Sequence, residues 1–233
     1  MRIAIINYCG TVGKTTIAAH LLAPRLKDYK ILSVESINEN ASSISNIEFE
    51  EMSSTKFSKI FTEIIKQDNL ILDVGASNVE NFMNGLIQFE KSFDYIDLFL
   101  VPITQENKAQ KESISTVQFL IDIGVSTDKI KVIFNRVDDD ANEIFKNIIA
   151  KLNKLNIKIN PHLTIAETEL FDNLGVKKMN IKDLFNKDFK QILSTQEKGS
   201  KEYNNTVDLI VMQANAVAID KHLDIVFNNL GLH

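Results

Sequence analysis

The sequence predicts an α/β protein with a doubly wound, mostly parallel sheet flanked by helices. Short apolar runs rich in Ile, Val, Leu and Phe recur along the chain, and helical patterns separate them. The runs are continuously hydrophobic rather than alternating, which is typical of strands that helices cover on both faces. Alternation of strand and helix along a chain favours a parallel sheet. The length of 233 residues predicts a single domain over residues 1–233.

The expected elements of the first two thirds of the chain follow from these patterns. Strands are predicted at residues 3–8, 30–35, 69–74, 96–101, 131–135 and 163–166. Helices are predicted at residues 15–26, 55–66, 79–90, 108–123 and 141–155. Residues 36–51 are polar, with clusters of Asn and Ser, and are predicted to form a mobile loop. Ligands of doubly wound folds bind at the carboxyl ends of the strands, so the candidate functional residues are those that follow each strand.

From about residue 167 the strand signal stops and the chain becomes mainly helical. Helices are predicted at residues 167–174, 181–193 and 203–230, with an exposed link at residues 196–205. Apolar residues recur every three or four positions in the last stretch, which predicts a helix that packs on the sheet or forms a dimer surface. A membrane-surface helix is the alternative, although Lys221 is the only Lys or Arg there and such helices are usually rich in both.

Composition narrows the class of protein. The formal net charge of −5 argues against a surface adapted uniformly to nucleic acid. A single cysteine rules out an intramolecular disulfide and favours a reducing compartment. No segment approaches the ~20 apolar residues that a membrane span requires, and the chain enters a strand at once, without room for a signal peptide. The expected location is therefore cytoplasmic.

A glycine-containing loop directly follows the first predicted strand. Residues 7–16 read NYCGTVGKTT, and a helical pattern begins after them. A strand, a loop that ends in Gly-Lys-Thr and a helix form the arrangement that binds nucleotide phosphates. The alternative is an ordinary turn between strand and helix. The expected phosphate-binding residues are Gly10, Thr11, Val12, Gly13, Lys14, Thr15 and Thr16.

The residue types in this loop match that chemistry. Gly10 and Gly13 allow the backbone to bend and to approach an anion closely. The N–H groups from Gly13 to Thr16 are the unpaired donors of a helix start, where the helix dipole adds positive charge. Lys14 is predicted to neutralise the outer phosphates as the P–O bond breaks, which makes it a candidate catalytic residue. The Thr15 hydroxyl is a suitable hard oxygen ligand for Mg²⁺.

The predicted strand at residues 69–74 ends in an acidic residue. Asp73 is a candidate catalytic and metal-binding residue, because acids at this position of phosphate-binding folds hold Mg²⁺ and respond to the γ-phosphate. An Asp at a strand end also serves as a turn former or helix cap, which is the alternative. Gly75 would let the following backbone approach the γ-phosphate, so residues 75–78 form a candidate switch.

Two other strand ends carry candidate residues. Glu35 is predicted to act through the waters of the metal, with a solvated strand end as the alternative. Asn135 has the donor and acceptor needed to pair with the amino group and a ring nitrogen of adenine. The string from Asn135 to Asp138 is also similar to the guanine-reading N-K-x-D pattern, with Arg136 in place of Lys. Adenine is favoured, and GTP and a plain turn residue remain the alternatives.

Lysine is frequent in the region that precedes the last predicted helix. Such a run is typical of a solvated helical face, and it is also the best candidate for weak, salt-dependent, non-specific contact with the DNA backbone. Its basic residues are Lys177, Lys178, Lys182, Lys187, Lys190, Lys198 and Lys201.

Residues 9–15 resemble the shorter "deviant" loop, K-G-G-x-G-K-[ST], of the ParA/MinD superfamily. In that superfamily the first Lys reaches the nucleotide of the partner subunit, but here Cys9 occupies this position. Ile37 stands where the second acid of the family, which helps to position the attacking water, is expected. The resemblance therefore implies phosphate binding through Lys14 and Thr15, with two catalytic positions vacant.

Longer strings resemble the StbB plasmid-stability proteins within this superfamily. They are residues 5–18, 20–25, 34–38, 73–80 and 134–135, so that the resemblance covers residues 1 to about 135 well and the rest loosely. It implies a Mg²⁺-dependent, ATP-binding protein and slow ATPase that acts in plasmid stability and segregation, with an effect on conjugation. It also implies a nucleotide-linked homodimer and a small plasmid DNA-binding partner protein. A non-catalytic, nucleotide-dependent switch or adaptor is the alternative from another class, and a GTPase is a third.

Overall fold

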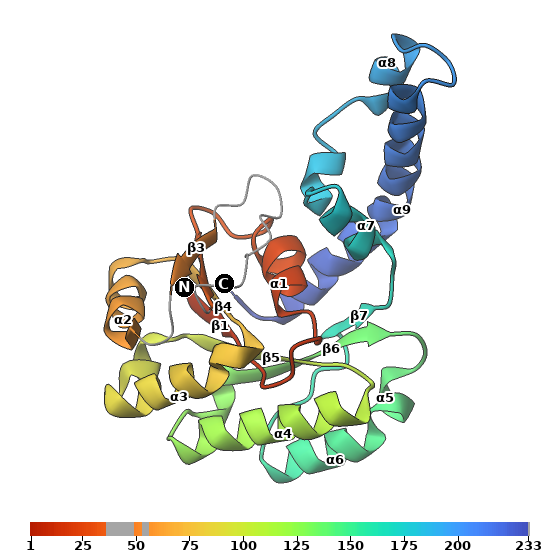
Figure 1. Cartoon of the computed structure of the whole chain (residues 1–233). Coiled ribbons are helices and arrows are strands. Elements are labelled where there is room, and N and C mark those ends of the chain that lie inside the picture. Colours follow the sequence, from red (N-terminus) through yellow and green to blue (C-terminus); the bar gives the residue numbers. More distant parts are fainter. Residues whose placement is uncertain (36–48, 53–55, 233) are drawn as a thin grey trace.

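A computed structural model describes residues 1–35, 49–52 and 56–232 of the chain. Its centre is a seven-stranded sheet with the order β3-β2-β4-β1-β5-β6-β7, in which every neighbouring pair is parallel (Figure 1). The strands are β1 (Arg2–Ile5), β2 (Lys30–Val34), β3 (Phe49–Met52), β4 (Leu70–Val74), β5 (Leu98–Ile103), β6 (Ile130–Val137) and β7 (Thr164–Ala166). The predicted doubly wound, parallel architecture is confirmed.

The strand that the sequence did not predict is β3. It pairs with β2 from Ile31 to Val34 and forms one edge of the sheet. It lies at the end of the stretch predicted as a mobile loop, of which residues 36–48 lie outside the described part of the chain. Edge strands often contain charged residues, and this one includes Glu50 and Glu51, which explains why the segment read as a polar loop.

Helices connect the strands on both sides of the sheet. The helical elements are α1 (Lys14–Thr16), the π-helical η1 (Ile17–Leu22), α2 (Phe57–Lys66), η3 (Ala76–Asn78), α3 (Val79–Gln88), η4 (Ser92–Tyr95), α4 (Asn107–Asp122), η5 (Thr127–Lys129), α5 (Ala141–Ile144), α6 (Lys146–Lys154), α7 (Leu170–Val176), η6 (Ile181–Leu184), α8 (Phe189–Ser194) and α9 (Lys201–Asn229). The helix predicted at residues 181–193 is divided into η6 and α8. The predicted link at residues 196–205 ends earlier, because the Ser200 side chain accepts a hydrogen bond from the Tyr203 N–H and caps α9.

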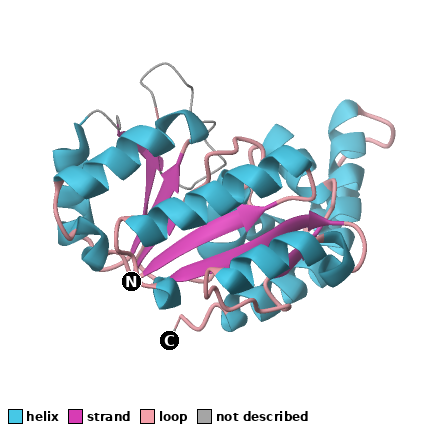
Figure 2. Cartoon of the chain, turned by 90° about the horizontal axis from the view of Figure 1, so that it is seen from below, coloured by secondary structure: helices cyan, strands magenta, loops and turns pink. Residues whose placement is uncertain are grey.

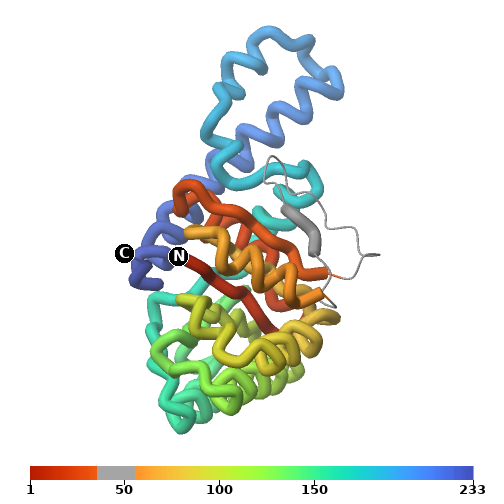
Figure 3. The backbone as a smooth tube through the Cα atoms, turned by 90° about the vertical axis from the view of Figure 1, so that its left-hand side faces the viewer, coloured from red at the N-terminus to blue at the C-terminus, as the bar shows by residue number. Residues whose placement is uncertain are grey.

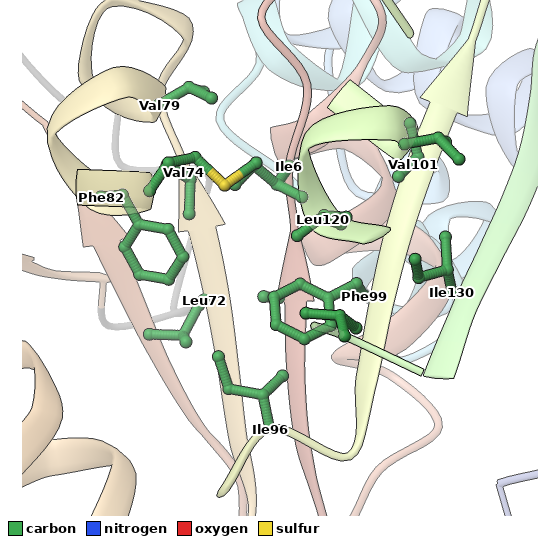
Figure 4. Packing of buried hydrophobic residues seen from close by; sticks show 14 of the residues in the cluster. Ile6, Leu72, Val74, Val79, Phe82, Ile96, Phe99, Val101, Leu120 and Ile130 are labelled. Atoms are coloured by element: carbon green, nitrogen blue, oxygen red, sulfur yellow. The ribbon is translucent and has the colours of Figure 1, made fainter. Parts of the chain in front are cut away.

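One face of the sheet is covered by α2, α3, α4 and α6. Figure 4 shows the packing at its centre, where Phe82 of α3 and Leu120 of α4 lie over Leu72 and Phe99 of the strands. All four side chains are fully buried. The continuous apolar runs of the sequence therefore correspond to strands that lie between two helical layers, which Figure 2 shows from below.

The opposite face is covered by η1, α7 and the C-terminal half of α9. Leu223 and Val226 of α9 belong to the same buried cluster as Ile3 and Ile5 of β1 and Leu21 of η1. The prediction that the last helix packs on the sheet is thus confirmed for the C-terminal half of α9. In the described parts of the chain, no helix combines the length and the apolar character needed to cross a membrane.

The N-terminal half of α9 leaves the sheet. Together with α8 and the connecting turn it forms a projection, residues 185–215, which we call the helical arm (Figures 1 and 3). Where α9 enters the sheet region, Arg25 joins it to the end of η1. The Arg25 guanidinium donates to Asp220 Oδ1 at 2.7 Å, to Asp224 Oδ1 at 2.8 Å and to the carbonyl of His20 at 2.9 Å. Asp220 also accepts from Lys182 at 2.6 Å.

Candidate functional site

A cleft of about 600 Å³ opens at the carboxyl ends of the central strands. The strand β1 lies between β4 and β5, but the chain leaves it through α1 towards β2, beyond β4. Such a reversal of strand order is the place where doubly wound folds bind ligands. The residues that line the cleft are Gly10, Thr11, Gly13, Lys14, Thr15, Thr16, Glu35, Asp73, Gly75, Ala76, Ser77 and Arg136. The structure therefore brings the predicted phosphate loop, the predicted acids and the predicted switch to one place.

The two glycines of the loop have different roles. Gly13 has φ +84°, a left-handed conformation that disfavours side chains, and a Cβ atom there would overlap the amide of Asn135. Gly13 is therefore required by the fold of the loop. Gly10 has no such requirement, because a Cβ atom would meet only the Cβ of Ala76 at 3.7 Å. The close approach of an anion at Gly10 stays a prediction.

The ammonium group of Lys14 is held inside the loop. It donates to the carbonyl oxygens of Cys9 at 2.7 Å and Asn7 at 3.2 Å, and the residue is only 5% exposed. Burial lowers the pKa of Lys14, and the negative charge of Asp73 partly opposes this shift. Phosphate oxygens are stronger acceptors for an ammonium group than neutral carbonyls, so the described arrangement is one from which Lys14 can turn towards an anion.

Thr15 and Asp73 form the candidate metal centre. The Thr15 hydroxyl donates to Asp73 Oδ2 at 2.7 Å, and Asp73 is 3% exposed. Burial raises the pKa of the Asp73 carboxyl, while the Thr15 hydrogen bond and the Lys14 charge lower it. A hydroxyl and a carboxylate side by side are the hard oxygen donors that suit Mg²⁺. Among the described residues, no group of three or more His, Cys, Asp or Glu side chains is arranged to hold a metal.

Three buried polar residues that sequence reasoning missed anchor the loop. The Asn7 side-chain amide donates to the carbonyl of Pro102 and to the hydroxyl of Ser113, both at 2.7 Å. The Thr116 hydroxyl accepts from the N–H of Tyr8 at 3.2 Å. Ser113 and Thr116 lie on the buried face of α4, among Ala109, Val117 and Leu120. Two hydroxyls within an otherwise apolar helix face were the available signal, since buried polar groups need partners.

The predicted base-reading residue lies beneath the loop. Asn135 is 4% exposed, and its amide donates to the carbonyl of Val12 at 2.9 Å. It lines a hollow of about 20 Å³ between β6 and the segment that follows β7. That volume is about what a single water molecule needs, and much less than a base needs. The other residues around the hollow are Thr16, Arg136, Ala166, Glu167, Thr168, Phe171 and Asp172.

The remaining predicted residues divide into two groups. Glu35 and Gly75 line the cleft, and the Gly75 N–H donates to the carbonyl of Val34 at 3.1 Å. A Cβ at residue 75 would lie 3.3 Å from this carbonyl oxygen, so glycine allows the ends of β4 and β2 to come close. Asp138 accepts from Gln105 at 3.3 Å and lines neither the cleft nor the hollow of the described chain. Ile37 lies outside the described residues.

Comparison with known protein families agrees with this geometry. The family model of the CobQ/CobB/MinD/ParA nucleotide binding domain matches residues 3–181. The chain belongs to this family. The match ends before the helical arm, so the arm and the C-terminal half of α9 lie beyond the part that defines the family. No curated protein sequence matches the chain.

Several solved structures share the fold. The cell division ATPase MinD of Pyrococcus furiosus is 13% identical, with 92% of this chain and 98% of that chain covered and a TM-score of 0.56. MinD of Pyrococcus horikoshii with Mg-ADP is 12% identical, with 89% and 93% covered and a TM-score of 0.52. A McdA–ATP complex from Cyanothece is 17% identical, with 94% and 97% covered and a TM-score of 0.50. At these identities the likeness is one of fold.

Proposed function

We propose that this protein binds ATP with Mg²⁺, hydrolyses it slowly and serves plasmid stability and segregation. The observation that carries the nucleotide part is the meeting of Lys14, Thr15 and Asp73 in one cleft, beside a loop whose Gly13 backbone only glycine adopts comfortably. The complexes of two fold relatives with Mg-ADP and with ATP support the choice of ligand. The plasmid role rests on the resemblance of residues 1–135 to StbB proteins.

The loop residues supply the binding chemistry. Lys14 exchanges the carbonyls of Asn7 and Cys9 for the outer phosphates, and the N–H groups from Gly13 to Thr16 donate to phosphate oxygens at the helix start. The Thr15 hydroxyl and the Asp73 carboxylate hold Mg²⁺, which neutralises phosphate charge when it is bound. Thr15 and Asp73, which hydrogen-bond to one another in the described arrangement, would hold the metal, and the metal would then balance the charge of the Asp73 carboxylate.

Adenine is the proposed base. Asn135 lies beside the loop and presents an amide to the hollow behind it, whereas Asp138, which a guanine reader needs, lines neither space. Because the hollow holds only about 20 Å³, base binding requires the segment after β7, which contains Phe171 and Asp172, to move outward. Competition between ATP and GTP for one site tests this choice.

A non-catalytic switch is the second candidate function, and Cys9 favours it. Cys9 occupies the position of the family's cross-subunit lysine and is buried against Val12 and Ala109, so it offers no charge to a transition state. In this alternative, bound nucleotide sets the conformation of residues 75–78 at the cleft for a protein partner, without turnover.

Single-turnover hydrolysis separates the two functions. The wild type and Lys14→Ala are each mixed with labelled ATP or GTP and Mg²⁺, with the protein in excess over the nucleotide, in the presence and in the absence of DNA. ATP cleavage that Lys14→Ala abolishes supports the ATPase, and tight binding without cleavage under every condition supports the switch. Failure of the wild type to bind either nucleotide would contradict both.

The proposed partners are a second copy across bound nucleotide, a small plasmid DNA-binding protein and, weakly, DNA itself. The exposed lysines Lys187, Lys190, Lys198 and Lys201 lie on the helical arm and support the DNA contact. Lys182 is less suited to it, because it pairs with Asp220 at 2.6 Å. Replacing the four arm lysines by Gln is expected to remove any salt-dependent DNA binding and to leave nucleotide binding unchanged.

A further inference from the structure

Arg136 has an unusual backbone at the rim of the nucleotide cleft. Its φ is +56°, in the left-handed region that residues other than glycine rarely adopt. The pairing of β6 with β7 shifts register here: Phe134 pairs with Thr164 and Val137 with Ala166, so three steps on β6 face two on β7. Such a bulge redirects side chains, and bulges are frequent beside active sites.

The bulge places Arg136 between the two parts of the site. Arg136 lines the phosphate cleft together with Lys14 and Asp73, and it also lines the hollow beside Asn135. Its side chain is exposed and makes no hydrogen bond or ion pair with any residue in the described part of the chain. A strained backbone that holds a cation without a protein partner at a cleft indicates a ligand-binding role more than a role in stability.

The charged side chains around the cleft indicate which part of the nucleotide Arg136 binds. Glu35 and Asp73 contribute two carboxylates, and Lys14 and Arg136 are the two cations that line the same space. Without Arg136, the described side chains of the nucleotide-free cleft would carry one more negative than positive charge. With Cys9 in the position of the family's lysine, the loop itself provides only Lys14. Arg136 is thus the second cationic side chain among the described residues that line the cleft.

We propose that Arg136 binds the terminal phosphate of the nucleotide from within the same subunit and replaces the charge that Cys9 does not supply. The planar guanidinium donates two hydrogen bonds at once to a phosphate, which a lysine cannot do. This inference rests on the proposed nucleotide binding. In this proposal Arg136 lets the protein discriminate between ATP and ADP. The bulge of β6 serves to place the Arg136 side chain.

The test measures affinities for the Mg²⁺ complexes of ATP and ADP and for AMP, in the wild type, Arg136→Asn and Arg136→Lys. Asparagine tolerates a positive φ, so Arg136→Asn removes the charge without adding backbone strain. The matched control is Lys151→Ala, which removes an exposed cation on α6, away from the cleft. Thermal melting of each variant checks that the fold is retained.

The expected result is a loss of about 10- to 100-fold in ATP affinity for Arg136→Asn, the range for one charged hydrogen-bonding group. The loss is smaller for ADP and absent for AMP, Arg136→Lys is intermediate, and Lys151→Ala equals the wild type. An equal loss for all three nucleotides would mean that Arg136 stacks on the base, and would overturn the proposal. Unchanged ATP affinity in Arg136→Asn would also overturn it. Lack of ATP binding by the wild type would instead refute the proposed function.

Discussion

In the sheet, every residue of β4 and β5 is buried, whereas α9 buries only five of its 29 residues. The five are spread along its length, and the outward side of the helix includes Val211 at 64% and Ile225 at 51% exposure. The core is thus stabilised by apolar burial on two faces, whereas α9 is stabilised by a few buried residues and by the polar links of Asp220 to Arg25 and Lys182 near the base of the arm. This difference predicts that the same kind of substitution has unequal effects in the two regions.

The largest effect is expected within α9 itself. Leu223→Ala removes a side chain that is 1% exposed against the sheet, and it should lower the free energy of unfolding by about 3 to 4 kcal/mol. Val211→Ala, on the outer side of the arm, should change it by less than about 0.5 kcal/mol. Urea unfolding of both variants measures the difference. Equal losses would show that the arm is packed as tightly as the core.

His20 connects the core to the C-terminal helices and should make stability depend on pH. It is 2% exposed, its ring packs at a tilt against Phe171 of α7, and its Nδ1 has no partner among the described residues. Burial lowers the pKa of His20 to about 4, while nearby Asp183 raises it. The unfolded chain therefore binds a proton that the folded chain does not, and about 3 kcal/mol of stability is lost as the pH falls from 6.5 to 4.

His20→Phe should remove this loss, because phenylalanine preserves the ring contact and does not titrate. The comparison is made by urea unfolding at several pH values between 4 and 7, with His162→Asn as the exposed control. If His20→Phe keeps the slope of the wild type, another group is responsible for the acid sensitivity.

The polar link at the base of the arm should contribute less. Arg25→Met breaks the buried ion pair with Asp220, in which the Arg25 side chain is 6% exposed and the Asp220 side chain 13% exposed. We expect a loss of about 2 kcal/mol, below the usual range for a broken buried pair, because Lys182 still neutralises Asp220. Lys158→Met breaks an exposed pair with Asp128 and should cost under about 1 kcal/mol. Equal costs would mean that burial adds nothing to the link.

The smallest expected effect is a gain in the stability of the protein when Asp73 in the nucleotide cleft is replaced. Burial raises the pKa of Asp73, so the folded protein holds this proton more tightly than the unfolded chain, and stability falls as the pH rises above 3.8. Asp73→Asn removes the buried charge and should stabilise the nucleotide-free protein at pH 7 on the order of 1 kcal/mol. It should also weaken Mg²⁺-dependent nucleotide binding. A less stable Asp73→Asn would show that the carboxylate is there for the fold.

The sequence predicted the sheet and the cleft better than the helical arm. The six core strands and the cleft residues from Gly13 to Asp73 were predicted, because continuous apolar runs and a Gly-Lys-Thr loop have few other physical explanations. The edge strand β3 was missed because a strand with one neighbour does not need an apolar sequence. The bulge at Arg136 depends on how β6 pairs with a strand some thirty residues later, which no local pattern shows.

The arm was predicted as helix but not as a projection. Its apolar positions, such as Val207, Ile210 and Val211, have the same spacing whether the helix covers a sheet or only a neighbouring helix. The anchoring of the phosphate loop by Asn7, Ser113 and Thr116 was missed for a related reason. Each of these residues is an ordinary polar residue until its burial is known.

The central claim is that this cleft binds the phosphates of ATP through Lys14. A calorimetric titration of MgATP into the wild type, Lys14→Ala and the exposed control Lys111→Ala tests it most directly. We predict one site in the wild type, unchanged affinity in Lys111→Ala and a loss of about 100-fold in Lys14→Ala, the upper range for one buried charge. Equal affinity in a folded Lys14→Ala, or no heat of binding in the wild type, would contradict the account.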